Sequence, residues 1–112
     1  MRIYMALVVG ILSASPALGG NPAYGAGPLE CSYMLKHIKI QEARSIMLGW
    51  FGGYITGRNY ELIRRSGKYA DTESLNEDLI IGHLISGCTA DPSLRVWQSA
   101  DRLIRTLPEK GL

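Results

Sequence analysis

The fold is decided by residues 41–65, which read QEARSIMLGWFGGYITGRNYELIRR. Apolar residues recur in this stretch at intervals that suit the faces of an α-helix. They form two rows, Ala43, Met47, Trp50 and Tyr54, and Ile46, Phe51, Ile55 and Leu62. Ser66-Gly67 follows directly and is a typical helix stop. We therefore predict one long helix over residues 41–65.

The interior of this predicted helix holds four glycines, Gly49, Gly52, Gly53 and Gly57. Each costs up to ~1 kcal/mol relative to alanine in a helix. Gly49, Gly53 and Gly57 stand four positions apart, so they share one stripe where another backbone can approach closely. Two interpretations remain open: a packing seam inside the protein, or a seam for a partner or a second copy. The apolar stretch that holds the glycines, residues 45–57, is too short to cross a bilayer.

Three shorter helices are predicted around the long one. The first covers residues 31–38, where Cys31, Met34 and Ile38 share a face. The next starts at a capping box, Ser74-Leu75-Asn76-Glu77, and runs to Cys88. The last opens at Asp91-Pro92 and ends at Pro108. A polar loop is expected over residues 68–73, and no strand is expected. The prediction is an all-α fold, a small four-helix orthogonal bundle over residues 31–108.

The N-terminus has the features of a signal peptide. Met1-Arg2 is a short basic region, residues 3–12 are largely apolar, and Ala17-Leu18-Gly19 offers small residues for cleavage. We predict a signal peptide over residues 1–19, with cleavage after Gly19 or at a later position up to Ala26. A retained anchor is the rival interpretation, although the apolar run is shorter than the ~20 residues of a membrane span. The Gly- and Pro-rich residues 20–30 are predicted to be a flexible leader. The mature protein is thus expected in the periplasm, with no stable membrane span after cleavage.

Export determines how the two cysteines are interpreted. In an oxidising compartment, two thiols in a small domain usually pair. A Cys31–Cys88 disulfide would close a loop of about 58 residues and contribute roughly 4 kcal/mol in the chain-entropy model. Free, reactive thiols are the alternative, although the sequence contains no CxxC motif.

The sequence offers little catalytic chemistry. Neither of the two histidines, His37 and His83, stands near a partner with metal-ligand spacing. We expect His37 at the surface and His83 partly facing the core, and we expect the scattered carboxylates to lie on solvated faces. No nucleophile elbow or phosphate-binding loop is present. The sequence therefore predicts a protein that is not an enzyme, with no catalytic residue, metal site or cofactor. Its near-neutral charge also gives no support to nucleic-acid binding.

Several of these elements together resemble the HdeA/HdeB family of periplasmic acid-stress chaperones. The resemblance rests on Cys31 shortly after the leader, on Trp50-Phe51-Gly52-Gly53-Tyr54-Ile55-Thr56-Gly57, on Leu75-Asn76, and on Cys88-Thr89-Ala90-Asp91-Pro92. It implies a small helical fold with one disulfide and a function without catalysis. Members are compact dimers at neutral pH that loosen in acid and hold unfolded periplasmic proteins on exposed apolar surface. The resemblance makes the striped helix the candidate client or partner surface, through Gly49, Trp50, Phe51, Gly53, Tyr54 and Gly57.

Two other functions remain open. Tai-type immunity proteins, which bind one secreted antibacterial effector, are also small, exported, helical and disulfide-bonded, with a similar Gly-Tyr-x-x-Gly helix. They often carry more cysteines than the two present here, which favours the chaperone family. The third alternative is an exported interaction protein with neither activity. The partner is accordingly expected to be unfolded periplasmic protein or one specific protein, and a homodimer is an option in each case.

Overall fold

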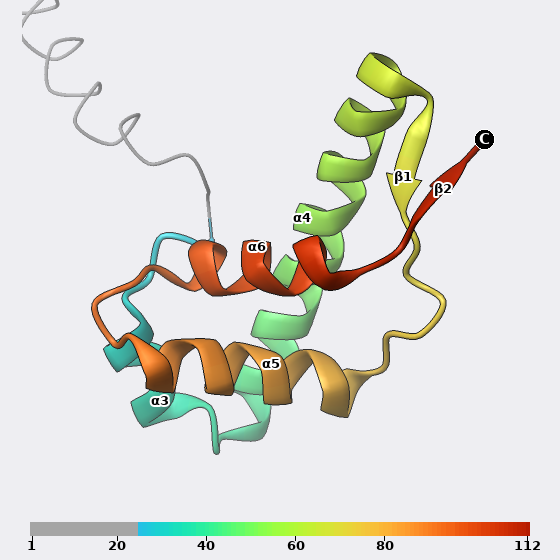
Figure 1. The fold of residues 1–112 in the computed structure, drawn as a ribbon. Helices are drawn as coiled ribbons and strands as arrows, with labels where there is room; N and C mark the ends of the chain where they lie inside the picture. The colour runs from blue at the N-terminus through green and yellow to red at the C-terminus, as the bar shows by residue number, and fades with distance from the viewer. Residues whose placement is uncertain (1–24) are drawn as a thin grey trace, which may run out of the picture.

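The structure, a computed structural model, describes residues 25–112. The predicted signal peptide and residues 20–24 of the predicted leader lie outside the described residues. The described chain forms four helices and two short strands (Figure 1). In chain order these elements are α3 (Cys31–His37), α4 (Gln41–Ser66), β1 (Lys68–Ala70), α5 (Glu77–Ala90), α6 (Val96–Thr106) and β2 (Glu109–Gly111). The prediction of a mostly helical fold with four helices is confirmed.

The helices pack around one apolar core. α5 and α6 lie side by side and run in opposite directions, while α4 crosses behind them and extends beyond α6 (Figure 1). α4 contributes Met47, Phe51 and Ile55 to the core, because a spacing of four residues keeps them on one face. The other helices supply Cys31, Met34, Ile81, Leu84, Cys88, Val96, Ala100, Leu103 and Ile104.

The long helix ends where its sequence predicts. α4 spans Gln41–Ser66, and Gly67 follows with a φ of 69°, the left-handed conformation that favours glycine. The Gly67 backbone N–H donates to the Ile63 carbonyl oxygen over 2.8 Å and so pairs one of the last free carbonyls of the helix. The end of α4 was therefore predictable from the local chemistry of residues 66–67 alone.

The predicted starts of the last two helices are wrong by a few residues. α5 has its N-cap at Asn76, not Ser74, because the Asn76 side chain accepts the Leu79 backbone N–H. α6 begins at Val96, not at Asp91-Pro92. Its predicted start is instead a loop, whose Pro92 carbonyl accepts a hydrogen bond from the first turn of α3. That tertiary contact outweighs the local helix-start signal.

The prediction that the chain has no strand is also wrong. β1 lies within the predicted polar loop over residues 68–73 and pairs antiparallel with β2, Lys68 opposite Gly111 and Ala70 opposite Glu109. Each strand has only three residues, too few to show an alternating pattern in the sequence. The Asn59 side chain fixes β1 to α4, since it donates to the Ala70 carbonyl oxygen over 3.0 Å and accepts the Ala70 N–H over 2.8 Å.

Residues 25–30, the second part of the predicted leader, contact the start of α6. The Gly27 and Leu29 carbonyl oxygens accept the backbone N–H groups of Trp97 and Val96, over 3.0 and 2.9 Å. The Arg95 guanidinium donates to the Pro28 carbonyl oxygen over 3.0 Å. These contacts lie between segments that are almost 70 residues apart in the sequence, which the Gly- and Pro-rich composition of residues 20–30 did not indicate.

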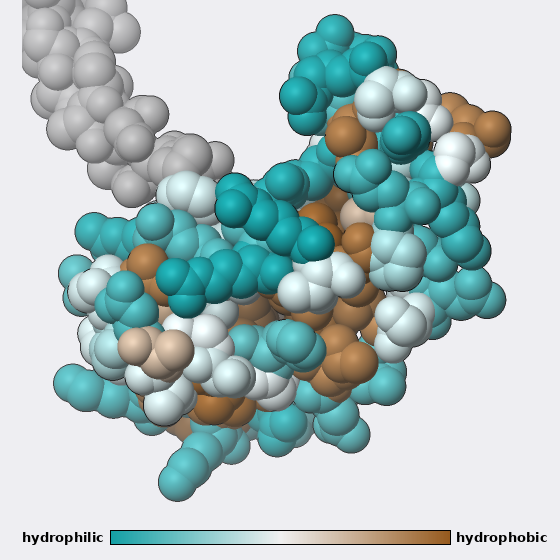
Figure 2. All heavy atoms as spheres, in the orientation of Figure 1, coloured by the Kyte–Doolittle hydropathy of each residue, from teal (hydrophilic) through white to brown (hydrophobic). Residues whose placement is uncertain are grey.

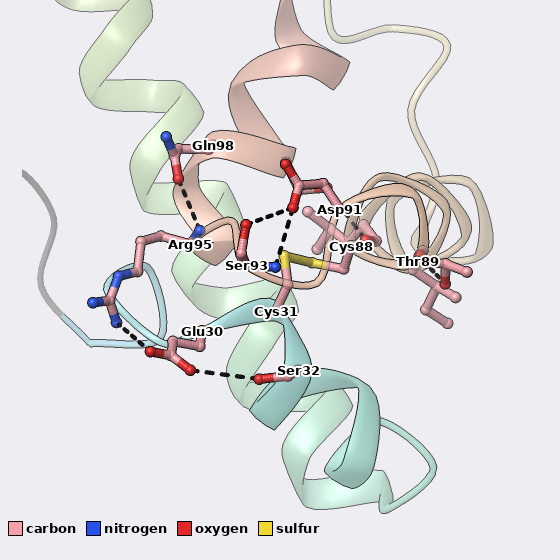
Figure 3. Close-up of a disulfide and its surroundings, with 12 residues drawn as sticks. Glu30, Cys31, Ser32, Cys88, Thr89, Asp91, Ser93, Arg95 and Gln98 are labelled. Carbon is pink, nitrogen blue, oxygen red and sulfur yellow. Dashed lines mark hydrogen bonds and ion pairs between the residues drawn. A yellow bond between two sulfur atoms is a disulfide. The ribbon is translucent and has the colours of Figure 1, made fainter.

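The predicted disulfide joins Cys31, at the start of α3, to Cys88, near the end of α5 (Figure 3). Both cysteines are fully buried, and their Cα atoms lie 4.9 Å apart. Within the loop after α5, the Asp91 Oδ1 accepts from the hydroxyl and the backbone N–H of Ser93 (Figure 3). The loop is held beside the bridge by the Cys31 backbone N–H, which donates to the Leu94 carbonyl oxygen over 2.7 Å. The disulfide therefore fixes α3 against α5 at a rigid point of the core.

Candidate functional site

An apolar groove lies between α3 and the first half of α4. It encloses about 360 Å³ and is lined mainly by Leu29, Tyr33, Met34, Ile38, Ile40 and Ile46, hereafter the α3–α4 groove. Three of these side chains are well exposed, Tyr33 at 52%, Ile40 at 50% and Ile46 at 64%. Ile46 shares a row of the sequence with Phe51 and Ile55, but the structure buries only those two and leaves Ile46 exposed. A cluster of large exposed apolar side chains around a groove is typical of a protein-binding surface.

The groove also contains an ordered polar side chain. The His37 ring stacks on Tyr33 with centroids 4.3 Å apart, and its Nδ1 lies 2.9 Å from the Tyr33 carbonyl oxygen. Because a carbonyl oxygen only accepts, this contact requires a proton on Nδ1. The histidine expected at the surface is half-buried and fixes the Tyr33 ring at the edge of the groove.

The glycine stripe of α4 points away from the core. Gly49, Gly52, Gly53 and Gly57 are all exposed, and a Cβ atom added to any of them would meet nothing within 4 Å. The interpretation of the stripe as an internal packing seam is therefore wrong for the part of the chain that the structure describes. The alternative, a seam for a partner or a second copy, stays a prediction.

The aromatic residues predicted beside the stripe are divided between core and surface. Phe51 is 1% exposed and belongs to the core. Trp50 and Tyr54 are half-buried and stack on each other, with ring centroids 4.9 Å apart. The Arg58 guanidinium lies over the Tyr54 ring, 5.9 Å from its centroid. The six residues predicted as one surface are thus not presented on a single face of the folded protein.

Asp101 on α6 is a site that the sequence did not reveal. Asp101 is only 8% exposed. Its carboxylate forms ion pairs with Arg58 of α4 and, over 2.8 Å, with Arg105 of α6. One indication of this burial is present in the sequence. Asp101 lies on the same helical face as the apolar residues Trp97, Ala100 and Ile104. The carboxylate links α6 to the part of α4 that extends beyond the core. Figure 2 shows apolar residues in the angle between α6 and this part of α4, as well as in smaller areas elsewhere on this side.

Within residues 25–112, no group of histidine, cysteine or carboxylate side chains is placed to hold a metal ion. In the same residues, no helix is both long and apolar enough to cross a membrane. His83, expected partly in the core, is exposed on α5 because Ile81 and Leu84 occupy its buried face. The carboxylates expected on solvated faces are exposed for the most part, and Asp101 is the buried exception among the described residues.

Comparison with known proteins adds no relative, since no protein-family model, no curated protein and no solved structure matches this chain significantly. Three features of the molecule bear on its function: the α3–α4 groove, the exposed face of α4 and the buried Asp101.

Proposed function

We propose that this protein is a non-catalytic, exported chaperone that holds unfolded proteins on apolar surface released by acid, the activity implied by the resemblance to the HdeA/HdeB family. Its compartment in this proposal is the periplasm, where disulfides form and persist. The helices would form the orthogonal bundle expected from the sequence. The proposal requires three properties: a contact that acid breaks, apolar surface beneath that contact, and a tether that acid leaves intact.

The observation that carries the proposal is the buried carboxylate of Asp101. Its ion pairs with Arg58 and Arg105 exist only while the carboxyl group is ionised. Protonation would remove the charge that attracts both guanidinium groups to α6, although the side chains of Arg58 and Arg105 are themselves 39% and 75% exposed. A second ionic contact is also acid-labile, since Lys110 of β2 pairs with Asp71 over 3.1 Å. Acid therefore weakens the contacts that hold α6 and β2 to the rest of the fold.

The surface beneath α6 supplies the required apolar area. Val96, Ala100 and Leu103 are at most 2% exposed, so movement of α6 would uncover them together with their core partners. The α3–α4 groove adds Tyr33, Ile40 and Ile46, which are already exposed. Burying apolar area of a client contributes about 25 cal/mol per Å², so a patch of several such side chains can hold an unfolded segment.

The tether is the Cys31–Cys88 disulfide, which has no acid-labile group. It keeps α3 and α5 together when the ionic contacts are lost. A partly opened molecule with a retained core is the form in which a small protein can present apolar surface without unfolding completely. Reduction of the disulfide is therefore expected to abolish the activity rather than increase it.

The experiment measures light scattering from an acid-denatured client protein between about pH 2 and pH 3, with and without this protein. Suppression of aggregation by the oxidised protein, and loss of suppression after reduction, is the expected result. Normal aggregation of the client at every acidic pH would refute the chaperone proposal.

A variant of Asp101 tests whether its carboxylate is the contact that acid breaks. Asp101→Asn removes the titrating charge, so we expect binding of a hydrophobic dye to begin at a higher pH than in the wild type. Asp78→Asn is the matched control, because Asp78 is exposed on α5 and makes no ion pair with the other described residues. Equal dye-binding midpoints in the two variants would exclude Asp101 as the acid-sensitive contact.

One observation favours the immunity alternative. The α3–α4 groove is open in the folded protein, with Tyr33 held by its stack on His37, so it is suited to bind a specific partner without acid. An immunity protein would bind one secreted effector tightly at neutral pH and would usually be encoded beside it. Tight binding to the product of a neighbouring gene at pH 7, with no protection of acid-denatured clients, would support this function over the first.

A further inference from the structure

The turn from α3 into α4 projects at one end of the molecule, and the α3–α4 groove lies beside it (Figure 1). The small sheet follows the opposite end of α4, so it does not cover this turn. Ile38 is buried, whereas Ile40 is 50% exposed. The Ile40 backbone N–H donates to the His37 carbonyl oxygen over 2.9 Å, which fixes the turn. An apolar side chain is thus presented to water on an ordered, projecting turn.

Two further large apolar side chains are exposed beside Ile40. Tyr33 is 52% exposed and Ile46 is 64% exposed, and both line the α3–α4 groove together with Ile40. The Tyr33 ring is held by its stack on His37, with centroids 4.3 Å apart. Tyr33, Ile40 and Ile46 therefore form one ordered apolar surface, hereafter the turn patch. An exposed apolar surface of this kind is typical of a contact site.

The charged residues around the turn patch are mainly positive. Between Tyr33 and Ile46 the chain carries Lys36, Lys39 and Arg44 but only one carboxylate, Glu42. Both lysines are exposed, and Arg44 is half-buried. None of the three cations forms an ion pair with the other described residues. The surface that covers the turn patch should therefore be anionic.

This combination of side chains favours a lipid surface over a protein surface. Tyrosine rings concentrate at the headgroup level of a bilayer, and long lysine side chains keep their charge in the headgroup region while their stems cover apolar surface. Anionic lipids attract such lysines. Protein–protein interfaces, in contrast, are depleted of lysine. A projecting turn also needs no matching hollow in a bilayer, because the headgroup region has no fixed shape.

We propose that the turn patch binds the surface of an anionic membrane. In this arrangement the three apolar side chains lie in the headgroup region, and Lys36 and Lys39 face lipid phosphates. The protein lies on the membrane and inserts no helix. The bound membrane covers the α3–α4 groove, so a membrane and a protein partner in the groove exclude each other. The inference does not depend on the chaperone activity, because it concerns the folded protein at neutral pH.

Sedimentation with vesicles tests the binding. The purified, oxidised protein is mixed at neutral pH with vesicles of phosphatidylcholine, or of phosphatidylcholine and phosphatidylglycerol. We expect it to sediment with the mixed, anionic vesicles and to remain in solution with the neutral ones. Added salt should release it, since salt screens the attraction between lysine and phosphate. No sedimentation with the anionic vesicles, or equal sedimentation with both kinds, would overturn the proposal.

Variants assign the contact to the turn patch. Lys39→Gln should weaken binding to the anionic vesicles by about fivefold, and Ile40→Gln by about tenfold. Lys68→Gln and Tyr60→Gln are the matched controls, because both side chains are exposed at the other end of α4 or just beyond it. Both controls should bind as the wild type does. Equal losses in the variants and their controls would overturn the proposal, and circular dichroism verifies that each protein is folded.

Two further measurements separate a membrane surface from a single bound lipid. A lipid with a paramagnetic headgroup should broaden the NMR signals of Tyr33 and Ile40 before those of Tyr60, which supports the proposed orientation. Short-chain phosphatidylglycerol below its micelle concentration supplies the same headgroup without a surface. Binding of this monomeric lipid in the α3–α4 groove, with no binding to vesicles, would overturn the proposal.

Discussion

Gly87 is a residue at which α5 and α6 approach each other closely. A Cβ added there would overlap the Ser99 hydroxyl and lie 3.2 Å from the Ser99 Cβ, so α5 and α6 can pack only because position 87 has no side chain. The Ser99 hydroxyl is buried at this contact and donates to the Leu84 carbonyl oxygen over 3.2 Å. The space between the two helices is thus set by one glycine and one small hydroxyl.

We therefore predict that Gly87→Ala lowers the free energy of unfolding by about 1–3 kcal/mol, as overpacking does in cores. Urea denaturation measures the effect. Gly82→Ala on the same helix is the control and should be neutral or stabilising, because its added methyl group meets nothing within 4 Å. The Gly87→Ala cost should be smaller in a Ser99→Ala background, and equal costs in the two backgrounds would contradict the proposed overlap.

Asn59 is the residue that attaches β1 to α4. Its side chain makes two hydrogen bonds to the backbone of Ala70, which is only 5% exposed. Asn59→Ala should lower the free energy of unfolding by about 1–3 kcal/mol, since it leaves buried backbone groups without these partners. Thr56→Ala is the matched control, because the Thr56 hydroxyl bonds only the Gly52 carbonyl of its own helix. Similar thermal midpoints for the two variants would contradict this role.

The two-stranded sheet is held by an ionic contact that depends on pH. The pKa of Asp71 is lowered, first by the hydrogen bond from the Glu73 backbone N–H and then by Lys110. A carboxyl group with a lowered pKa stabilises the folded state above its ordinary pKa, and this contribution is lost as the pH falls through the lowered value. The β1–β2 contact should therefore weaken in acid and stay intact in mild alkali.

Lys110→Ala separates the two causes of this shift. We expect the Asp71 pKa to rise in the variant but to stay below its ordinary value, because the Glu73 amide still donates to the carboxylate. An NMR titration of the Asp71 carboxyl carbon measures the pKa, and Lys68→Ala provides a control that removes a nearby charge of the same sheet. An unchanged Asp71 pKa in Lys110→Ala would contradict the assigned cause.

The elements differ in how far the sequence could predict them. α4 was predictable because its apolar spacing continues over many residues and a glycine marks its end. The short strands were not, since three residues carry no periodic signal and Ala70 is held by a side chain from another element. The start of α6 was misplaced because the Pro92 carbonyl bonds α3, a contact that local sequence does not encode.

The candidate site was less predictable than the fold. The glycine stripe was recognisable in the sequence, but periodicity does not tell whether such a stripe faces the core or the solvent. The burial of Asp101 could not be predicted for a related reason. A carboxylate within an apolar stripe is expected to be buried only when a partner for its charge, here Arg58, is known. The Cys31–Cys88 pair was predictable because the sequence holds two cysteines, which allow one pairing within the chain.

For the whole molecule, the segment before α3 is expected to be part of the folded unit. A chain that begins at Cys31 loses the carbonyls of Gly27, Pro28 and Leu29, which accept hydrogen bonds from residues 95–97. It should be less stable than a chain that begins at Gly25 by about 2 kcal/mol or more, given roughly 1 kcal/mol for each lost bond. Thermal unfolding of the two chains by circular dichroism measures the difference, and equal stabilities would show that residues 25–30 are dispensable.

The disulfide divides the described residues into three topologically different parts. Residues 31–88 form a closed covalent ring that contains α3, α4, β1 and most of α5. Residues 25–30 precede the ring, whereas α6 and β2 belong to a linear tail attached to the ring at one point. The tail is held in place only by packing, hydrogen bonds and ion pairs. It can therefore detach as a unit while the ring keeps its connectivity, and repeated opening and closing of the molecule needs no rearrangement of covalent bonds.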